Sequence, residues 1–521
     1  MKNKNLKVWL IILGAVVILV VIGFIFFRNV NDVQIESIKL TSPNNSAFFE
    51  NIQVNLNKPV SISVRYWSDS NSAVKYYTPE TSNGFKHTIH LVLLKPATTY
   101  QYQVIVHDFF NLSSKIESFH TRSLGSWMIH DWVKKNHPHE AGAIGKGLVM
   151  LCYGGTPGYV AMIDSNGKIR WYWQVDSIGV RAATLTPRNT ILVLLHNPGL
   201  DEINDVPDKS EVEKLNNMNV PLRRGRVGYA GGTSLAEVDL TGKILWRINI
   251  NADSLGYSSI HHDLRMDASH HILTLIRDPL PYNLSGEGGK VKDTLWGDAL
   301  IRIDTTGKIL WKWSPWTSWD FKDDRELNLL SYDRFHLNAL WITKDSNYLI
   351  SSAILNQIWK INAKTGKVMW KFGKSGNFKL DSGSYFYFQH DVNIAPNGDI
   401  IMFDNGDYSP FDTTQLKYRF TGLYTNSQYK VSRVLGFRLN ERDMTSRCTL
   451  NIQLPPKDYS SRMGSAYFLP NNNLLVTSSK TGKVLVMDTT GKILWELDSY
   501  FVPYRAEYIP DSVWKDYFRI K

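Results

Sequence analysis

Three histidines precede short apolar strands in matching positions, and their residue type is suited to chemistry. His390 begins the alternating stretch 390–394, which is followed by a Pro-Asn-Gly turn and a second apolar run. His262 and His336 precede similar stretches. A neutral imidazole can act as a nucleophile or carry a proton near pH 7, because its unperturbed pKa is about 6.5. Three histidines at the heads of three similar units therefore predict a shared site.

The turns after these strands provide a register for aligning the strand heads. Pro396 lies six residues after His390, and Pro187 lies six residues after Arg181. Pro470 lies six residues after Gly464. Arg462 precedes Gly464 by two residues and is expected on the same strand face. In the unit of His336 the turn is about two residues longer, which makes Asn338 its register partner. The predicted ring of side chains comprises Arg181, His262, His336, Asn338, His390 and Arg462.

A pocket lined by imidazoles, an amide and two guanidiniums is suited to an anion. Zinc is an alternative ligand for three histidines, but they come from separate units rather than from a compact motif, and the arginines disfavour a cation. Each histidine could also be an ordinary strand-end residue that makes only structural hydrogen bonds. We predict no metal and no cofactor.

The elements that position the ring are repeats. Each repeat ends in an apolar strand, Asp, a Gly-Lys turn and an apolar pair followed by Trp, as in 162–171 and 238–246. Five such turns are separated by 59 to 75 residues, except for a last step of 125 that leaves room for a degenerate copy within 418–438. Six units of four short strands are typical of a six-bladed β-propeller, which we assign to residues 145–521. The first strand of each blade then lines the central channel.

Residues 34–123 read as short alternating strands and predict a β-sandwich. Within it, the stretch Leu94-Lys95-Pro96-Ala97-Thr98-Thr99-Tyr100 resembles the turn before a late strand of fibronectin type III domains. A spacing or association role is expected for this domain. The whole chain is thus predicted to be all-β apart from its N-terminus.

The N-terminal residues 1–28 contain an uncharged apolar run from Val8 to Phe27, which is about the length a bilayer core requires. No A-x-A-like cleavage site follows, so we favour an uncleaved transmembrane anchor over a cleaved signal peptide. Three lysines precede the run and one arginine follows it, which predicts an inner-membrane protein whose remaining residues face the periplasm.

Composition and charge exclude other classes of protein. Aromatic residues make up 12% of the chain, more than a disordered chain carries. The net charge of +11 is spread along the sequence without a nucleic-acid-binding motif, so no nucleic-acid partner is expected. The two cysteines, Cys152 and Cys448, leave one disulfide or two free thiols as alternatives.

The strand heads and turns resemble those of the bacterial arylsulfotransferases. The resemblance is carried by Gln389-His390-Asp391, Phe403-Asp404-Asn405-Gly406, Phe335-His336-Leu337-Asn338-Ala339, Arg462-Met463-Gly464-Ser465-Ala466 and the closing Tyr504-Arg505-Ala506-Glu507-Tyr508-Ile509-Pro510. It implies a six-bladed, often dimeric protein outside the cytoplasm. It also implies transfer of a sulfuryl group from a phenolic sulfate to a phenol, independent of the nucleotide sulfate donor PAPS.

The resemblance assigns roles to individual residues. It implies that His390 is the nucleophile that forms a transient sulfohistidine and that His262 handles the phenol proton. It further implies that His336 and Asn338 hold the sulfuryl oxygens. These roles suit the residue types, because phenolate departure benefits from an acid and donors aimed at the oxygens stabilise charge in transfer.

One departure from the family pattern stands out. An arginine expected on the strand after the His-x-Asn segment is absent, since the chain reads Ser351-Ser352-Ala353 there. Arg181 or Arg462 could take its place. Two other functions stay open: a tethered propeller that only binds an anionic or aromatic ligand or scaffolds envelope proteins, and a quinoprotein dehydrogenase, against which six units instead of eight and the three histidines count.

Overall fold

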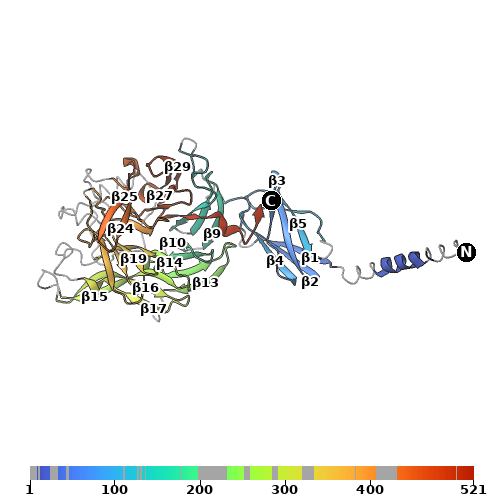
Figure 1. Cartoon of the computed structure of the whole chain (residues 1–521), viewed down its shortest axis with the longest axis horizontal. Coiled ribbons are helices and arrows are strands. Elements are labelled where there is room, and N and C mark those ends of the chain that lie inside the picture. The colour runs from blue at the N-terminus through green and yellow to red at the C-terminus, as the bar shows by residue number, and fades with distance from the viewer. Residues whose placement is uncertain are drawn as a thin grey trace. The chain divides into compact units, whose positions relative to one another are not determined.

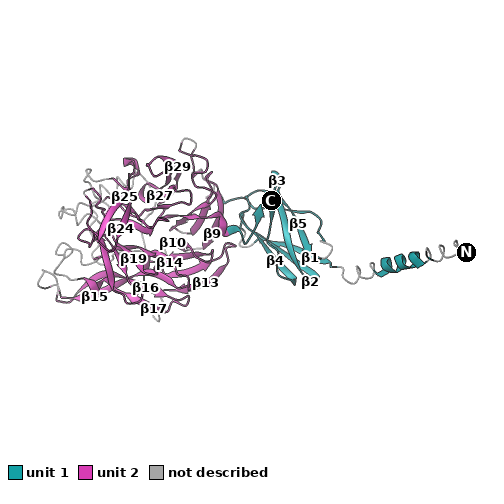
Figure 2. Ribbon diagram, viewed as in Figure 1, with its two compact units in different colours: residues 1–125, 514–521 teal, residues 126–513 magenta. Residues whose placement is uncertain are grey.

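The chain forms two compact units in a computed structural model (Figure 2). The first comprises residues 1–125 and 514–521, and the second residues 126–513. The structure describes residues 9, 12–23, 33–42, 46–108, 112–125, 128, 132–134, 137–155, 157–175, 178–196, 231–250, 259–283, 285, 291–319, 334–381, 383–406, 431–499 and 501–520. Residues 418–420, in the proposed degenerate repeat, lie outside this set.

The first unit consists of seven strands, and the longest of them, β2, takes part in two sheets (Figure 1). The first part of β2 pairs with β1 and β4, and its second part pairs with β3 and β5. Alternate residues of these strands are buried in one core. The strands are β1 (Ile35–Thr41), β2 (Glu50–Ser68), β3 (Asn71–Tyr77), β4 (Gly84–Leu91), β5 (Thr99–His107), β6 (Glu117–His120) and β31 (Arg519–Ile520).

Hydrogen bonds to both sides of the Lys95 backbone hold the predicted Leu-Lys-Pro turn. The backbone N–H of Lys95 donates to the hydroxyl of Tyr100 at 2.8 Å, and the hydroxyl of Thr121 donates to the carbonyl of Lys95 at 2.6 Å. The similarity to fibronectin type III domains stays a prediction.

The domain boundary at the end of the chain differs from the predicted one. Residues 145–521 were assigned to the propeller, but β31 pairs with β3 through Tyr76–Ile520 and Tyr77–Arg519. Residues 514–521 therefore belong to the first unit.

Near the N-terminus, residues 12–23 are helical. Within the described residues, no helix combines the length and apolar character needed to span a membrane. The other parts of the predicted span, residues 8, 10, 11 and 24–27, lie outside the described residues, so the anchor stays a prediction.

The second unit is a six-bladed β-propeller, as predicted, with four strands in each sheet. Blade 2 contains β10 (Gly179–Leu185), β11 (Ile191–His196), β12 (Ser234–Val238) and β13 (Ile244–Asn249); blade 3 contains β14 (Ile260–Met266), β15 (Ile272–Tyr282), β16 (Asp293–Ile303) and β17 (Ile309–Trp313). Blade 4 contains β18 (Leu337–Ile342), β19 (Tyr348–Ser352), β20 (Gln357–Ile361) and β21 (Val368–Gly373); blade 5 contains β22 (His390–Ile394), β23 (Ile400–Asp404), β24 (Arg433–Asn440) and β25 (Thr445–Gln453). Blade 6 contains β26 (Ser465–Phe468), β27 (Leu474–Ser478), β28 (Lys483–Met487) and β29 (Ile493–Asp498).

The first blade joins two distant parts of the chain. Its inner strand is β30 (Ala506–Ile509), which pairs with β7 (Leu148–Tyr153), followed by β8 (Gly158–Ile163) and β9 (Ile169–Val175). The ring of blades is thus closed by backbone hydrogen bonds between residues about 355 positions apart in sequence. Short 3-10 helices are η6 (Pro315–Ser318), η11 (Pro456–Asp458), η12 (Ser479–Thr481) and η13 (Asp511–Trp514).

The repeated Asp and Gly have a local explanation. Asp164 Oδ1 accepts hydrogen bonds from the backbone N–H groups of Asn166 and Lys168, both at 3.0 Å, and Gly167 has a φ of 74°. The carboxylate closes the turn and glycine tolerates its left-handed conformation. Asp239, Asp304 and Asp488 bond their turns in the same way.

Four inner strands share an irregularity near the same end. The pairing register of β10, β14, β18 and β22 with their neighbours shifts after Val180, His261, Leu337 and His390. Such bulges redirect side chains and are frequent next to functional sites. Here they position the residues of the predicted ring.

Candidate functional site

The three predicted histidines gather in one place. The ring centroids of His262 and His336 are 5.1 Å apart, and those of His336 and His390 are 6.4 Å apart. The ring of Phe388 lies 5.2 Å from that of His336 and 5.6 Å from that of His390. The prediction that strand heads from three blades converge is therefore confirmed as geometry.

The backbone around these histidines adopts unusual conformations. The φ angles of His262 (61°), His336 (47°), Phe388 (57°) and Met463 (59°) all lie in the left-handed region. This conformation is unfavourable for residues with a side chain, and it clusters at functional sites, where the surrounding structure enforces it. Here the bulged strands and their hydrogen bonds hold it.

The imidazole of His390 is fixed by Asn405. His390 Nδ1 lies 2.7 Å from Asn405 Oδ1 and 3.0 Å from the carbonyl of Phe388. The other end of the amide, Asn405 Nδ2, donates to the carbonyls of Ser460 and Met463 at 2.7 and 2.8 Å. Two acceptors therefore face Nδ1, so Nδ1 carries the proton and Nε2 keeps its lone pair.

His390 is also kept neutral. Burial is the main cause that lowers its pKa to about 4, and the charges of Arg505 and Arg462 act in the same direction. The backbone N–H of Met463 donates to His390 Nε2 at 3.3 Å. The nitrogen with the lone pair is thus beside a backbone donor, and two arginines act on the ring electrostatically, as suits a group that receives an anionic electrophile.

His262 is backed by a buried pair that the sequence did not reveal. His262 Nδ1 lies 2.7 Å from His261 Nδ1, and His261 Nε2 lies 3.2 Å from Asp298 Oδ1. The same carboxylate oxygen accepts a hydrogen bond from Arg277 Nη1 at 2.9 Å. Burial lowers the pKa of His262 well below its ordinary value, and nearby positive groups lower it further.

Residues next to the histidines bind the following blade. Asp263 Oδ2 accepts from the backbone N–H of Leu340 at 2.9 Å, and Asp391 Oδ2 accepts from that of Ala466 at 3.1 Å. Asn338 Nδ2 donates to the carbonyl of Gln389 at 2.8 Å. Asn338 is fully buried, so its amide nitrogen positions the residue before His390.

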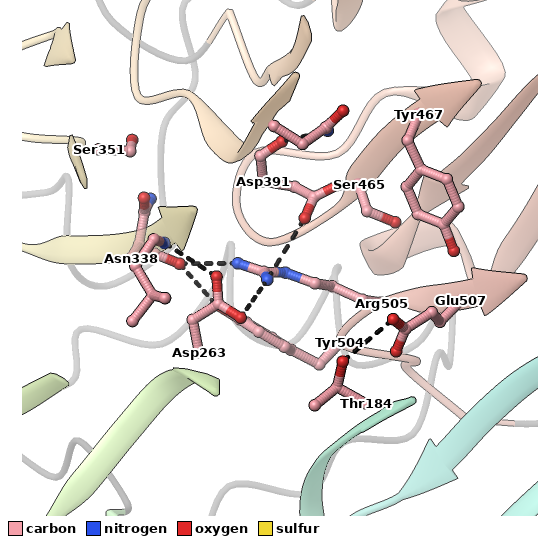
Figure 3. Close-up of polar contacts among 12 residues, drawn as sticks. Thr184, Asp263, Asn338, Ser351, Asp391, Ser465, Tyr467, Tyr504, Arg505 and Glu507 are labelled. Atoms are coloured by element: carbon pink, nitrogen blue, oxygen red, sulfur yellow. Dashed lines mark hydrogen bonds and ion pairs between the residues drawn. The ribbon is translucent and has the colours of Figure 1, made fainter. Parts of the chain in front are cut away.

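Arg505 is the functional-site candidate that sequence reasoning missed (Figure 3). Its Nη1 lies 2.8 Å from Asp263 Oδ1 and 3.3 Å from Asp391 Oδ1, and its Nη2 donates to the carbonyl of Asn338 at 2.8 Å. Tyr504 donates its hydroxyl to the same carbonyl at 3.3 Å. The two aspartates hold the pKa of Arg505 above its ordinary range despite its burial. One cation thus joins the inner ends of blades 1, 3, 4 and 5.

A signal for Arg505 was present in the sequence. The stretch 504–510 was recognised as a motif, but it was not assigned as an inner strand. Once β30 is the inner strand of blade 1, Arg505 stands at its head, as His390 stands at the head of β22.

The two predicted arginines differ in their surroundings. Arg462 precedes Met463 and acts electrostatically on His390. Arg181 lies at the bulge of β10, where its carbonyl accepts a bond from the thiol of Cys152 at 3.6 Å. Burial raises the pKa of this thiol to about 12, against the opposing charge of Arg181. Cys152 and Cys448 are both free cysteines.

The place where the resemblance led us to expect an arginine is filled by a network of neutral groups. Gln389 Nε2 donates to Ser351 Oγ at 3.0 Å and to the carbonyl of Ser352 at 3.1 Å. Ser352 Oγ donates to the carbonyl of Phe335 at 2.6 Å, and Ala353 is fully buried. These groups fix the segments that precede His336 and His390.

A cavity of about 650 Å³ extends from the layer of Arg505 towards the turns that follow the inner strands. Of the three histidines, His262 lines it. Arg265 lies over the ring of Trp341, 4.9 Å from its centroid, and 3.6 Å from Glu507 Oε1. Burial raises the pKa of Glu507 to about 7. This part of the channel is therefore polar at its centre and lined by aromatic side chains at its wall.

The family sequence model described as Arylsulfotransferase (ASST) matches residues 134–484. The chain belongs to the arylsulfotransferase family. The match includes all three histidines, Asn338, Asn405 and Arg462, whereas Arg505 lies beyond it. The family resemblance expected from the strand heads is thus confirmed, and an aryl sulfotransferase activity is supported at the level of the family.

Solved structures with low similarity include a protein of unknown function from Bacteroides caccae, at 13% identity over 70% of this chain and 99% of that chain, with a TM-score of 0.39. A virginiamycin B lyase from Staphylococcus aureus is 10% identical over 61% and 69%, with a TM-score of 0.30. The sensor domain of the anti-sigma factor RsgI4 from Pseudobacteroides cellulosolvens is 30% identical over 18% and 92%, with a TM-score of 0.15. At these TM-scores none supports an inference. No curated protein matches the chain.

Proposed function

We propose that this member of the arylsulfotransferase family transfers a sulfuryl group from a phenolic sulfate ester to a phenol through a covalent intermediate on His390. One observation carries the proposal: Asn405 holds the proton on His390 Nδ1 at 2.7 Å, so that the buried, neutral imidazole presents the lone pair of Nε2. Such a nitrogen is a competent nucleophile at neutral pH without a cofactor.

The reaction has two balanced halves. His390 Nε2 attacks the sulfur of the aryl sulfate, the N–S bond forms, the S–O bond to the aryl group breaks, and the phenolate leaves with a proton. An acceptor phenol then loses its proton and attacks the same sulfur, and the N–S bond breaks. His262 is the proton carrier in both halves, because its ring lies beside that of His336 next to His390.

The sulfuryl oxygens need hydrogen-bond donors while negative charge shifts between the leaving and the attacking phenol oxygens. The backbone N–H of Met463 already points at His390 Nε2 from 3.3 Å. Arg462 contributes positive charge next to it. We assign these two groups the role of the arginine that is absent near Ala353, with His336 as a further donor to the sulfuryl oxygens. Asn338 has a different role, because its amide nitrogen orients the backbone of Gln389.

Trapping tests the proposal directly. The full-length protein is mixed with an aryl [³⁵S]sulfate, quenched in alkali, and searched for radioactive sulfohistidine by peptide mapping. Label on the peptide that contains His390, and its loss in His390→Asn, is the expected result. His120→Asn, at an exposed histidine of the first unit, is the matched control and should label normally. A wild-type protein that never labels contradicts the mechanism.

A propeller that only binds a ligand is the competing function, and the neutral network at Ser351 and Ser352 favours it. Such a protein binds an aryl sulfate in calorimetry but releases no phenol. Release of phenol together with label on His390 excludes this alternative.

The location of the protein is proposed on its sequence. The apolar run from Val8 to Phe27 would anchor the chain in the inner membrane with both units in the periplasm. Alkaline phosphatase fused after residue 521 should then be active. Association through the first unit is proposed as well, and a doubled mass in light scattering would support a homodimer.

A further inference from the structure

We propose that Asp298 and His261 form a proton relay behind His262, which lets His262 exchange a proton with the phenol without carrying a positive charge itself. The proposal rests on the proposed function, because the relay acts only when a phenolate leaves or a phenol attacks. His261 and Asp298 are then positioning residues, since they act through His262.

The relay is a continuous line of contacts in the interior. Asp298, His261 and His262 are joined by contacts of 3.2 Å and 2.7 Å. The exposed fractions are 1% for Asp298 and 3% for His261, so both side chains are shielded from water. Asp298 Oδ2 also accepts a hydrogen bond from the backbone N–H of Leu337 at 2.8 Å, which fixes the carboxylate against blade 4.

Asp298 is a carboxylate in the folded protein. Burial alone would raise its pKa, but Arg277 and His261 outweigh this effect and hold the pKa of Asp298 below its ordinary value. A carboxylate offers only lone pairs, so the nitrogen that faces it, His261 Nε2, carries a proton. The states of the relay then differ in which of the two Nδ1 atoms, that of His261 or that of His262, carries the proton between them.

Two states of that bond are chemically consistent. When His261 is an imidazolium, its Nδ1–H donates to His262 Nδ1, and His262 carries its own proton on Nε2. When His261 is neutral, His262 Nδ1–H donates to His261 Nδ1, and His262 Nε2 has a lone pair. His262 is neutral in both states, and the positive charge, when present, faces Asp298.

The surroundings of His262 explain why the positive charge is placed on His261 rather than on His262. Positive side chains act on it from β15, where Arg277 lies, and from the segment before β30, where Arg505 lies. His336, directly before β18, and His390, at the start of β22, also lie near it, and the ring centroid of Tyr504 is 6.0 Å from that of His262. An imidazolium at His262 would lie next to these positive groups, whereas a positive charge on His261 faces Asp298.

The relay balances the two halves of the reaction. As the donor's phenolate leaves, it takes the proton from His262 Nε2, while the Nδ1 proton of His261 moves to His262 Nδ1. The acceptor phenol later gives its proton to His262 Nε2, and the Nδ1 proton returns to His261. The relay ends as it began, with the imidazolium opposite Asp298.

Two substitutions break the relay at different points. His261→Gln keeps a polar side chain but cannot store a proton, and Asp298→Asn keeps an acceptor for Leu337 but removes the charge opposite His261. Both should slow transfer from phenyl sulfate, a poor leaving group, by about 10²- to 10⁴-fold, the usual contribution of a general acid. Transfer from a nitrophenyl sulfate, whose phenolate leaves without an acid, should fall less than about tenfold.

The dependence on the leaving group separates a relay from a structural role. A variant that merely disturbs the fold slows all donors by the same factor, so equal losses for phenyl sulfate and nitrophenyl sulfate overturn the proposal. His120→Gln, at an exposed position, is the control, and both variants should still form label on His390 from nitrophenyl [³⁵S]sulfate. If the wild type forms no label at all, the proposed function fails instead, so the two failures can be told apart.

Discussion

Asn405 follows β23 directly and His390 begins β22 of the same blade, and the amide oxygen of Asn405 lies 2.7 Å from His390 Nδ1. The amide nitrogen of Asn405 is bound to the carbonyls of Ser460 and Met463. Because both of these residues precede blade 6, the orientation of His390 depends on the interface between blades 5 and 6. The reactive nitrogen is set by the packing of two blades rather than by one strand.

Replacing Asn405 tests this arrangement. Asn405→Leu should lower the rate of His390 labelling by roughly 10²- to 10⁴-fold, as loss of an orienting partner does in other histidine-dependent enzymes. The dissociation constant for an aryl sulfate should change little, because Asn405 faces His390 Nδ1 rather than Nε2. Single-turnover labelling and calorimetry measure the two quantities. Asn397→Leu, at an exposed turn of the same blade, is the control, and equal rates in both variants would contradict the role of Asn405.

The pH dependence of labelling should reflect a depressed pKa. Burial is the main cause that lowers the pKa of His390 to about 4, so the imidazole stays a nucleophile down to about pH 5. Single-turnover labelling with nitrophenyl sulfate should therefore be constant from pH 8 to about pH 5 and fall below it. A midpoint near the ordinary value of about 6.5 would show that His390 is solvated like a free imidazole.

The same shift affects stability in a defined direction. The unfolded chain binds the His390 proton near pH 6.5, whereas the folded protein binds it only near pH 4. Between these values the unfolded state holds more protons, so this group lowers the free energy of unfolding as the pH falls through the window. Urea unfolding at pH 7 and pH 5 should show a smaller decrease for His390→Asn than for the wild type, and equal decreases would contradict the shift.

Removing Arg505 should destabilise the propeller strongly. Arg505→Met leaves the buried carboxylates of Asp263 and Asp391 without their shared cation, and breaking a buried pair in this way costs about 3–5 kcal/mol. Arg438→Met is the matched control, since Arg438 also pairs with an aspartate, Asp399, but its side chain is 51% exposed. The control should lose much less stability, because an exposed ion pair is screened by solvent. Urea unfolding followed by tryptophan fluorescence measures both, and similar losses would contradict a central role for Arg505.

The two arginines predicted to replace the absent one should differ in effect. Arg462→Ala should reduce labelling about 10²- to 10³-fold, the usual effect of losing one oxyanion donor, because Arg462 acts on His390. Arg181→Ala should have a smaller effect, since Arg181 lies beside Cys152. If neither substitution changes turnover of an aryl sulfate, neither arginine holds the sulfuryl group.

The repeat could be predicted from the sequence because it is local. The Asp that closes each turn, its Gly and the following Trp lie within ten residues, so their spacing alone revealed five of the six units. Convergence of the histidines followed from the symmetry of the repeat. The sixth unit, blade 5, lacks this turn. The inner strand of blade 1 was not predicted because it is supplied by residues 506–509, far from the three strands that it joins.

The partners of the histidines could not be predicted, since they lie on or next to other strands of the same blade, outside the repeated sequence pattern. Asp298 reaches His261 from the third strand of blade 3, and Asn405 reaches His390 over 15 positions. The bulges in the inner strands also shift the register by a residue or more, so the spacing to the next turn no longer indicates which side chain faces the channel. The predicted Asn338 illustrates this, because its amide nitrogen binds the backbone of Gln389.

The closure of the ring by β30 has a consequence for how the protein is made. Arg505 arrives with this strand, which follows the strands of blades 2 to 6 in the sequence. Until then Asp263 and Asp391 lack their common counter-ion, and the nascent chain has neither a closed channel nor a finished site. The ion pairs that join the inner ends of blades 1, 3 and 5 can therefore form only after the last strand of the ring has been made.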